Sequence, residues 1–436
     1  DDAYRVPKVT DIYWFRSDLR INDNPALQLH CGVDRLLCVF FWPRDIPWCN
    51  LKGLGRQRER FLIESLEALR AQLAELGQKL LVFRETPAQV LPSLVDEYKV
   101  TRIGVARSPG SYERLDEKAV AARVSVPLVV HEGNTLFSEK ALQSTKLSLK
   151  QFTPFRRSVE PLQASNPAGV AVMPPPPRGL NALPLPAARV RPDPSFGARG
   201  GAKAGEARLK VWMHREGAVT SYKETRNQLD GLFYSSFLSP WLANGSLAVS
   251  KLAWELDQFE KLHGANDSTR HFYSELLWRE FFYRREVEDS SSLFRAKGTA
   301  RERKLVTFDP RGFARWCAGA TDYPLVNALM HQLVESGWMS NRGRQIAASC
   351  LVNEMNVDWR FGAAFFEQHL LDYDAASNYG NWQYIAGVGA DPRGGRHFDL
   401  VKQTRQFDPE GEFTQRWEGY CPKQPEHIVD AADWPL

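Results

Sequence analysis

The first third of the chain alternates between strand-like and helix-like segments, and this alternation restricts the fold more than any other feature. Five short runs rich in β-branched and aromatic residues predict strands at 9–15, 36–42, 79–84, 102–106 and 126–131. Helical stretches at 56–77, 87–99 and 113–123 lie between them, and leucines recur at spacings of three and four in the first. Strands that alternate with helices predict a parallel sheet wrapped by helices.

A proline-rich segment at 161–207 ends this pattern. It contains the run Pro174–Pro175–Pro176–Pro177 and four further prolines at 184, 186, 192 and 194. Proline interrupts both helices and central strands, so we expect a linker that runs over the surface. After Ala207 the pattern is almost wholly helical as far as Asp372. We therefore predict an α/β domain over residues 1–160, a linker over 161–207 and an all-helical domain over 208–436.

Composition excludes several classes of protein. Of the 436 residues, 43% are hydrophobic, and no run of about 18 apolar residues predicts a membrane-spanning helix. The net charge of +4 is too small to require a polyanionic partner, so any basic patch must be local. The six cysteines form no CxxC pair and have no histidine at ligand spacing, which predicts no metal site. We expect a monomer in a reducing compartment: the cytoplasm, or an organelle such as the chloroplast if a transit peptide has been removed, and not the secreted space.

Nucleotide-binding motifs are absent from the α/β region. Neither of two short glycine pairs, at 53–55 and 387–389, has the third glycine of a dinucleotide fingerprint, and there is no Walker A sequence. The 13 tryptophans, 24 phenylalanines and 13 tyrosines instead predict large aromatic surfaces, either in the core or under a ring-shaped ligand.

Four polar and aromatic segments mark the helical region. In the first, at 233–242, Ser235, Ser236 and Ser239 precede Pro240, and hydroxyls at a helix N-terminus suit phosphate. By itself this segment favours a plain serine cap. In the second, Glu275, Trp278 and Arg279 share one helix face, which suits a planar ligand as well as it suits a simple ion-paired helix. The third and fourth, at 338–345 and 372–384, place acids and amides among aromatic rings and predict a buried pocket for a heteroaromatic ring.

These four segments, in this order and spacing, resemble the flavin-binding domain of the cryptochrome/photolyase family, and the resemblance covers nearly the whole chain. The segments at 14–20 and 23–27 are similar to the opening strand and loop of the family. Within the family, the chain is most similar to the DASH cryptochromes. This similarity is carried by Phe152–Glu160, Asn341–Gln345, Asn378–Tyr384 and Phe407–Phe413.

The resemblance implies a U-shaped FAD in the helical domain. It places Tyr222 and Arg226 beside the phosphates, and Arg279 and Trp338 as walls of the pocket. The remaining cofactor contacts that it implies are Ser235, Ser236, Leu238 and Ser239 at the pyrophosphate, Asn341, Arg344, Asp372 and Asp374 at the polar edge of the isoalloxazine, Asn378 near flavin N5, and Glu275. A neutral amide at Asn378 adds no negative charge beside an anionic reduced flavin and therefore favours the reduced form.

The resemblance also implies repair of cyclobutane pyrimidine dimers, in which excited reduced flavin lends an electron to the flipped-out lesion. Glu275, Trp278, Asn341 and Asn378 are then the catalytic residues, with Trp278 stacked on the lesion. The residues expected to contact DNA are Trp278, Arg342, Gln345, Tyr384, Arg393 and Arg396. Tyr384 and Gln345 stand where duplex-repairing relatives typically have tryptophan and methionine, which predicts a preference for dimers in single-stranded DNA or looped duplex.

The family usually has three tryptophans that re-reduce the flavin. Trp382 and Trp359 occupy the first two positions, and Val306 occupies the third. DASH proteins also usually bind a folate antenna, 5,10-methenyltetrahydrofolate, through a glutamate that precedes a helix. In this sequence Arg107–Ser108–Pro109–Gly110 stands there instead, so the folate is expected from the family alone. The alternative function is a blue-light signalling cryptochrome without significant DNA repair.

Overall fold

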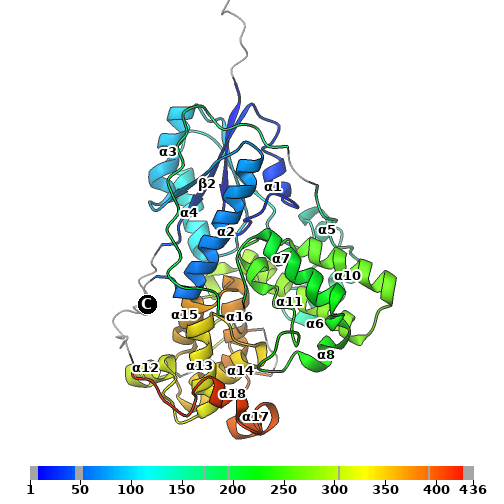
Figure 1. The fold of residues 1–436 in the computed structure, drawn as a ribbon, viewed down its shortest axis with the longest axis vertical. Coiled ribbons are helices and arrows are strands. Elements are labelled where there is room, and N and C mark those ends of the chain that lie inside the picture. The colour runs from blue at the N-terminus through cyan, green and yellow to red at the C-terminus, as the bar shows by residue number, and fades with distance from the viewer. Residues whose placement is uncertain are drawn as a thin grey trace, which may run out of the picture.

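The structure is a computed structural model that describes residues 8–44, 53–169, 172–193, 197–302, 305–390 and 393–425. Cys49, Pro194 and residues 426–436 lie outside these ranges. An α/β layer forms the upper part of the molecule in Figure 1, and a group of packed helices forms the lower part. The fold class predicted from the sequence is therefore confirmed.

A five-stranded, wholly parallel sheet forms the centre of the α/β domain. Its strands run in the order β3-β2-β1-β4-β5. They are β1 (Thr10–Phe15), β2 (Arg35–Phe41), β3 (Leu80–Phe83), β4 (Arg102–Ala106) and β5 (Leu128–His131). β1 is buried at every position, as expected of a central strand covered on both faces. All five predicted strands are present, with ends that differ by one or two residues.

Four helices connect these strands: α1 (Pro25–Gln28), α2 (Arg56–Glu75), α3 (Pro87–Tyr98) and α4 (Ser111–Ala121). The leucine spacing seen in the sequence buries Leu66, Leu69 and Leu73 of α2 against the sheet. α3 begins at a capping box formed by Thr86 and Gln89, and ends at Lys99, which adopts a left-handed conformation. Because the strand order reverses between β1 and β4, the carboxyl ends of these strands open a crevice.

The other elements are helical. The α-helices are α5 (Glu139–Gln143), α6 (Phe152–Val159), α7 (Ala202–Leu209), α8 (Tyr222–Thr225), α9 (Ser239–Ala243), α10 (Val249–His263), α11 (Asp267–Glu288), α12 (Pro310–Ala318), α13 (Pro324–Ser336), α14 (Asn341–Ser349), α15 (Trp359–His369), α16 (Ala375–Ala386), α17 (Leu400–Phe407) and α18 (Glu412–Arg416). Two π-helical turns, η2 (Lys210–Arg215) and η5 (Cys350–Glu354), continue α7 and α14, and η3 (Ala218–Ser221) and η4 (Ser290–Ser292) are 3₁₀ turns.

The described residues between α6 and α7, at 160–169, 172–193 and 197–201, form no regular elements and run along the molecule as an extended strap (Figure 1). It is anchored to the sheet: the Leu36 backbone N–H donates to the carbonyl of Pro175, and Gln78 Nε2 donates to that of Pro174 at 2.8 Å. Regular structure returns at Ala202, inside the range expected to be linker.

The core of the helical part also takes in residues that precede the strap. Phe137, Phe155 and Val159 are buried in the same cluster as Trp212 and Phe281. The α5–α6 region therefore packs with the helices, although it lies within the range 1–160 expected for the α/β domain. Hydrophobic spacing shows which face of a helix is buried, but it does not show which of two cores receives that face.

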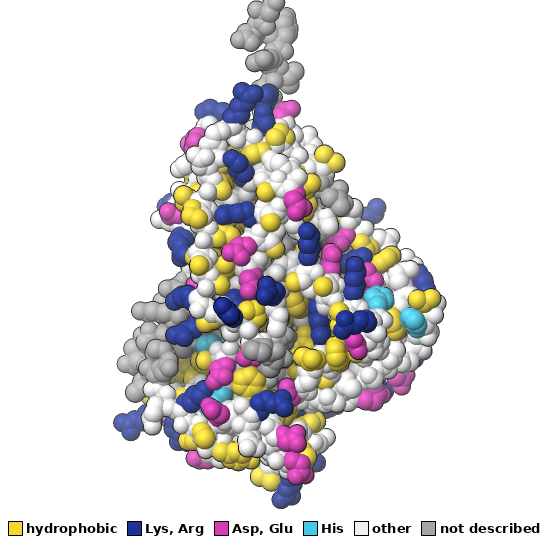
Figure 2. Space-filling model, viewed as in Figure 1, with side chains coloured by type: hydrophobic (Ala, Val, Ile, Leu, Met, Phe, Trp, Pro, Cys, Tyr) yellow, Lys and Arg dark blue, Asp and Glu magenta, His cyan; other side chains and the backbone are white. Residues whose placement is uncertain are grey.

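Basic and acidic side chains are interspersed on the face shown in Figure 2, so this face has no extended field of one sign. Within the described ranges, no helix is both long and apolar enough to cross a membrane. In the same residues no group of three or more histidine, cysteine, aspartate or glutamate side chains could hold a metal ion.

Candidate functional site

A cavity of about 470 Å³ lies among the helices of the lower domain, and most of the residues singled out in the sequence line it. Its volume is in the range of small-molecule and cofactor sites. The predicted residues that line it are Tyr222, Arg226, Ser235, Ser236, Ser239, Glu275, Trp278, Arg279, Trp338, Asn341, Arg344, Gln345, Asp372, Asp374, Asn378, Trp382, Tyr384 and Arg396. Segments as distant as Tyr222 and Arg396 therefore share one wall.

Asp372 is the centre of a polar cluster in this cavity. Its Oδ2 accepts hydrogen bonds from Ser239 Oγ at 2.7 Å and from Arg344 Nη2 at 2.8 Å. Its side chain is only 5% exposed, and its Oδ1 is buried and has no hydrogen-bond partner among the described residues. A buried carboxylate oxygen without a partner is costly, so this atom indicates a ligand that donates a hydrogen bond.

Arg344 is held in place from three sides. Besides its ion pair with Asp372, its Nε donates to the carbonyl of Met339 at 2.8 Å, and its guanidinium lies 5.1 Å from the Trp338 ring centroid. Trp338 in turn donates from Nε1 to the hydroxyl of Tyr234 at 3.1 Å. Burial raises the pKa of Tyr234 to about 12, so this phenol remains protonated. Tyr234 was not among the residues predicted for this site.

Asn378 lies on α16, at the deep end of the cavity. Its Nδ2 donates to the carbonyl of Ala363 on α15 at 2.9 Å. This bond fixes the orientation of the amide and leaves Oδ1 as the atom that can accept a hydrogen bond from a ligand. Asp374 caps α16 by accepting from the Ser377 backbone N–H at 3.0 Å, and also from the Ser377 hydroxyl.

Glu275 on α11 lies between two positively charged or titratable partners. Arg226 Nη1 is 3.5 Å from its Oε1, and His271 Nε2 is 3.1 Å from the same oxygen. His271 was not predicted as a site residue, although its i, i+4 spacing from Glu275 places both side chains on the same face of the helix. Both side chains of the Arg226–Glu275 pair are about one-third exposed, so the pair remains accessible from the cavity.

The ring of Phe152, for which no role was predicted, supports Trp278. Phe152 of α6 stacks on it with a centroid distance of 3.7 Å and an interplanar angle of 8°. Tyr384 of α16 meets it edge-on at 5.6 Å. One face of the indole is therefore covered by Phe152, so a flat ligand ring must use the other face.

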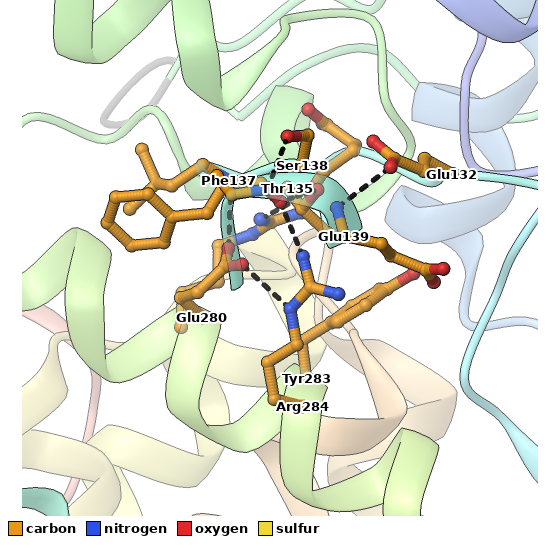
Figure 3. A network of polar contacts seen from close by, with 12 residues as sticks. Glu132, Thr135, Phe137, Ser138, Glu139, Glu280, Tyr283 and Arg284 are labelled. Atoms are coloured by element: carbon orange, nitrogen blue, oxygen red, sulfur yellow. Dashed lines mark hydrogen bonds and ion pairs between the residues drawn. The ribbon is translucent and has the colours of Figure 1, made fainter. Parts of the chain in front are cut away.

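A polar network holds α11 against the loop that follows β5 (Figure 3). Glu280 Oε2 accepts the backbone N–H of Leu136 at 2.8 Å, and Arg284 Nη2 donates to the carbonyl of Phe137 at 2.7 Å. Arg279, the residue before Glu280, donates from Nη1 to the carbonyl of Asn134. The α/β domain thereby fixes the position of the helix that carries Glu275 and Trp278.

The remaining predicted residues do not line the cavity. Leu238 is 1% exposed and packs in the hydrophobic core, and Trp359 is also buried away from the cavity. Arg342 lies over the rings of Phe398 and Phe407 and donates to Asn227 at 3.2 Å. Arg393 is exposed outside the cavity lining.

Arg342 belongs to a local group of positive charges. Burial lowers its pKa, and the neighbouring charges of Arg226 and Arg396 lower it further. Arg396 also lies 5.7 Å from the ring centroid of Tyr384 at the cavity wall. A local group of arginines therefore lies beside Tyr384, although the net charge of the whole chain is small.

A second cavity of about 510 Å³ lies at the carboxyl ends of β1, β2 and β4. Trp14, Phe41 and Ser108 line its α/β side, and Glu367 and Tyr373 line its helical side. Glu113 also lines it, and one of its carboxylate oxygens is buried with no hydrogen-bond partner in the described parts of the chain. Burial raises the pKa of this side chain. Ser108, Pro109 and Gly110, which replace the glutamate expected in the family, lie in its wall.

Comparison with known proteins assigns the family. Residues 11–177 match the DNA photolyase family, and residues 272–432 match the FAD binding domain of DNA photolyase. The sequence is 40% identical to cryptochrome DASH of Vibrio parahaemolyticus, over 99% of this chain and 98% of that protein. It is 41% identical to cryptochrome DASH of Idiomarina loihiensis, over 98% and 96%. The chain belongs to the cryptochrome DASH branch of the cryptochrome/photolyase family.

Solved structures of the family have the same fold. The Synechocystis cryptochrome superposes with a TM-score of 0.86 at 32% identity, covering 95% of this chain and 89% of the other. A class III photolyase of Agrobacterium tumefaciens superposes with a TM-score of 0.78 at 26% identity, covering 100% and 92%. The chain therefore contains a photolyase-type FAD-binding domain, and most of the residues that line the helical cavity belong to it.

Proposed function

We propose that this cryptochrome DASH uses FAD and blue or near-ultraviolet light to split cyclobutane pyrimidine dimers, preferentially in single-stranded DNA or looped duplex. The observation that supports this most strongly is the convergence of Asp372, Asn378, Glu275 and Trp278 on one cavity. Illumination of the reduced protein with a dimer-containing oligonucleotide, followed by assay of restored pyrimidines, tests it directly.

The residues that are present fit an FAD. The unpartnered Oδ1 of Asp372 is suited to an N–H or O–H donor of the cofactor, and Arg344 and Trp338 offer a charged and a flat wall beside it. Ser235, Ser236 and Ser239 lie at the same cavity where hydroxyls could hold phosphates. When bound in its reduced form, the flavin would supply the light-excited electron.

The chain's own residues have distinct parts in this proposal. Asn378 would accept a hydrogen bond at its Oδ1 from a protonated N5, because its amide nitrogen is already committed to Ala363. Trp278 would stack on the lesion with the face that Phe152 leaves open. Glu275 would bond the polar edge of the pyrimidine from its position between Arg226 and His271, and Asn341 at the start of α14 would lie at the mouth.

A local group of positive charges would bind the phosphates of the DNA backbone. Arg342 and Arg396 form the positive group beside Tyr384, and Arg393 is exposed nearby in sequence. Cations of this kind position a strand without reading its sequence. A signalling cryptochrome without repair is the alternative, and the repair assay distinguishes the two functions.

The first prediction concerns strandedness. Flipping a dimer out of a duplex costs a few kcal/mol, whereas each stacked base returns roughly 1–3 kcal/mol, so a pocket with Tyr384 and Gln345 should capture the lesion poorly from duplex. We expect repair of dimers in single-stranded DNA to be about tenfold or more faster than in duplex at matched salt. Tyr384→Trp combined with Gln345→Met should narrow this ratio. Equal rates for the parent protein on both substrates would contradict the preference.

The second prediction concerns photoreduction of bound flavin. Trp382 lies in the cavity wall and is the expected first electron donor. Trp382→Phe should slow light-driven reduction on the order of tenfold or more, measured by flavin absorbance during illumination. Trp316→Phe is the matched control, because Trp316 is equally buried and its ring centroid lies 6.0 Å from that of Trp382. If Trp382→Phe and Trp316→Phe both bind FAD and photoreduce it equally slowly, Trp382 is not specifically the first electron donor.

The second cavity is the place that we propose for an antenna chromophore. It opens at a topological switch point of the parallel sheet, where such folds generally bind ligands. The family favours 5,10-methenyltetrahydrofolate, and the unpartnered oxygen of Glu113 could accept a hydrogen bond from a ligand there. Mass spectrometry of chromophores released from the purified protein by heat tests this assignment.

We also propose that the protein works in a reducing compartment. Cys31, Cys38, Cys317, Cys350 and Cys421 are all free thiols in the described part of the chain. Burial raises the pKa of Cys31 to about 11 and keeps its thiol protonated.

A further inference from the structure

The two tryptophans expected to donate electrons are both shielded from solvent. Trp382 and Trp359 are each 2% exposed. The family usually has a third tryptophan at the position of Val306. The aliphatic side chain of Val306 cannot donate an electron to an oxidised tryptophan. An electron hole formed on Trp382 therefore needs another oxidisable group, or it will return to the flavin.

Tyr379 lies beside Trp359. Its ring centroid is 6.1 Å from that of Trp359, with an interplanar angle of 75°. It is located on α16, one helical turn before Trp382, and it is 0% exposed. Phenol and indole are the two ring types in proteins that are oxidised most readily, so Tyr379 is a chemically suitable next donor.

A buried carboxylate lies at the hydroxyl of Tyr379. The phenol O–H donates to Glu367 Oε2 of α15 at 3.3 Å, and Glu367 is 8% exposed. A phenol gives up an electron far more easily when its proton can move to a base at the same time. Burial raises the pKa of Glu367, which makes its carboxylate a stronger proton acceptor than an exposed one.

We propose that Tyr379, with Glu367 as acceptor of its proton, takes over the electron hole from the buried tryptophan pair. This inference rests on the proposed photoreduction of a bound FAD. Trp382 would give one electron to the light-excited flavin when the cofactor is bound, and Trp359 would give one electron to Trp382. Trp359 then takes an electron from Tyr379 while the phenolic proton passes to Glu367 Oε2, leaving a neutral tyrosyl radical and a carboxylic acid. An external thiolate returns the electron, and Glu367 returns the proton.

Aromatic contacts continue from Tyr379 towards the second cavity. Phe294 meets Tyr379 at 4.6 Å between centroids, and Tyr112 meets Phe294 at 5.8 Å. Tyr112 lines the second cavity. When no antenna chromophore occupies this cavity, a small thiolate that enters it would be separated from the radical by these two rings, or by Glu367, which lines the same cavity.

The test uses FAD-containing protein, a light pulse, a thiol and no DNA, with electron paramagnetic resonance as the readout. The parent should show a neutral tyrosyl radical. Tyr379→Phe should remove it and slow photoreduction about tenfold, and Glu367→Gln, which preserves size but not basicity, should lower the radical yield about 100-fold. Tyr373→Phe is the matched control, because Tyr373 also hydrogen-bonds Glu367 but makes no ring contact with Trp359 among the described residues.

The outcomes separate two kinds of failure. A parent that binds no FAD overturns the proposed function and this inference together. A parent that binds FAD but does not photoreduce it overturns only this inference, because repair is assayed with protein that is already reduced. If the parent photoreduces normally and Tyr379→Phe keeps both the photoreduction rate and the tyrosyl radical, only the inference is overturned. The same holds if Tyr373→Phe, and not Tyr379→Phe, removes the signal. FAD content is measured by absorbance in all variants, and equal content shows that the compared proteins are folded and carry the cofactor.

Discussion

Replacement of Asp372 by asparagine should release most of the bound FAD. The substitution keeps the size of the side chain but removes the charge that pairs with Arg344 at 2.8 Å. It also weakens the acceptor for Ser239 and the unpartnered Oδ1 that we assign to the cofactor. A hydrogen bond to a charged group contributes about 1.5–3 kcal/mol, so we expect FAD affinity to fall about 10–100-fold. Fluorescence titration of FAD into apoprotein measures this loss.

Asp399→Asn is the matched control for this variant. Asp399 caps α17 by accepting the Lys402 backbone N–H, on an exposed part of the helical domain outside the cavity. Asparagine caps helices about as well as aspartate, so folding and FAD affinity should both be retained. If Asp372→Asn is folded, as judged by thermal unfolding of the apoprotein, and still binds FAD like the parent, the assigned position of the isoalloxazine edge is wrong.

Removal of the Trp278 ring should nearly abolish recognition of the dimer. Stacking contributes roughly 1–3 kcal/mol per base, and a dimer presents two bases, so Trp278→Ala should weaken binding of dimer-containing single strands by at least about tenfold. FAD content should remain, because the cofactor contacts come mainly from other elements. Binding in the dark, measured by fluorescence anisotropy, separates this loss from any effect on the photochemistry.

Two further variants define the origin of the effect. Phe152→Ala should give a smaller loss of the same kind, since Phe152 stacks on Trp278 at 3.7 Å and fixes its plane. Trp254→Ala is the control: this tryptophan is 38% exposed on α10 and packs against Lys251. Dimer affinity unchanged in Trp278→Ala, or lost equally in Trp254→Ala, would mean that the lesion is not held by this indole.

Local spacing was sufficient to predict the elements and many of the cavity residues. The strands follow from runs of β-branched residues, and α2 follows from leucines that recur on one helix face. Asn341 and Asp372 could be selected because each lies in a short segment that places acids and amides among aromatic rings. Ser235 and Glu275 could be selected only through the order and spacing of the four segments. Their roles came from the family resemblance, and those roles remain predictions.

Only the tertiary structure shows which of these segments meet, and with which partners. Asp372 contacts Ser239 across 133 positions of sequence, and Phe152 reaches Trp278 from the far side of the strap. The contact of Tyr379 with both Trp359 and Glu367 depends on how α15 and α16 cross. Spacing along a helix fixes which side chains share a face, because that depends on 3.6 residues per turn. The partner that covers the face depends on the burial of all the helices together, and no single segment of the sequence encodes it.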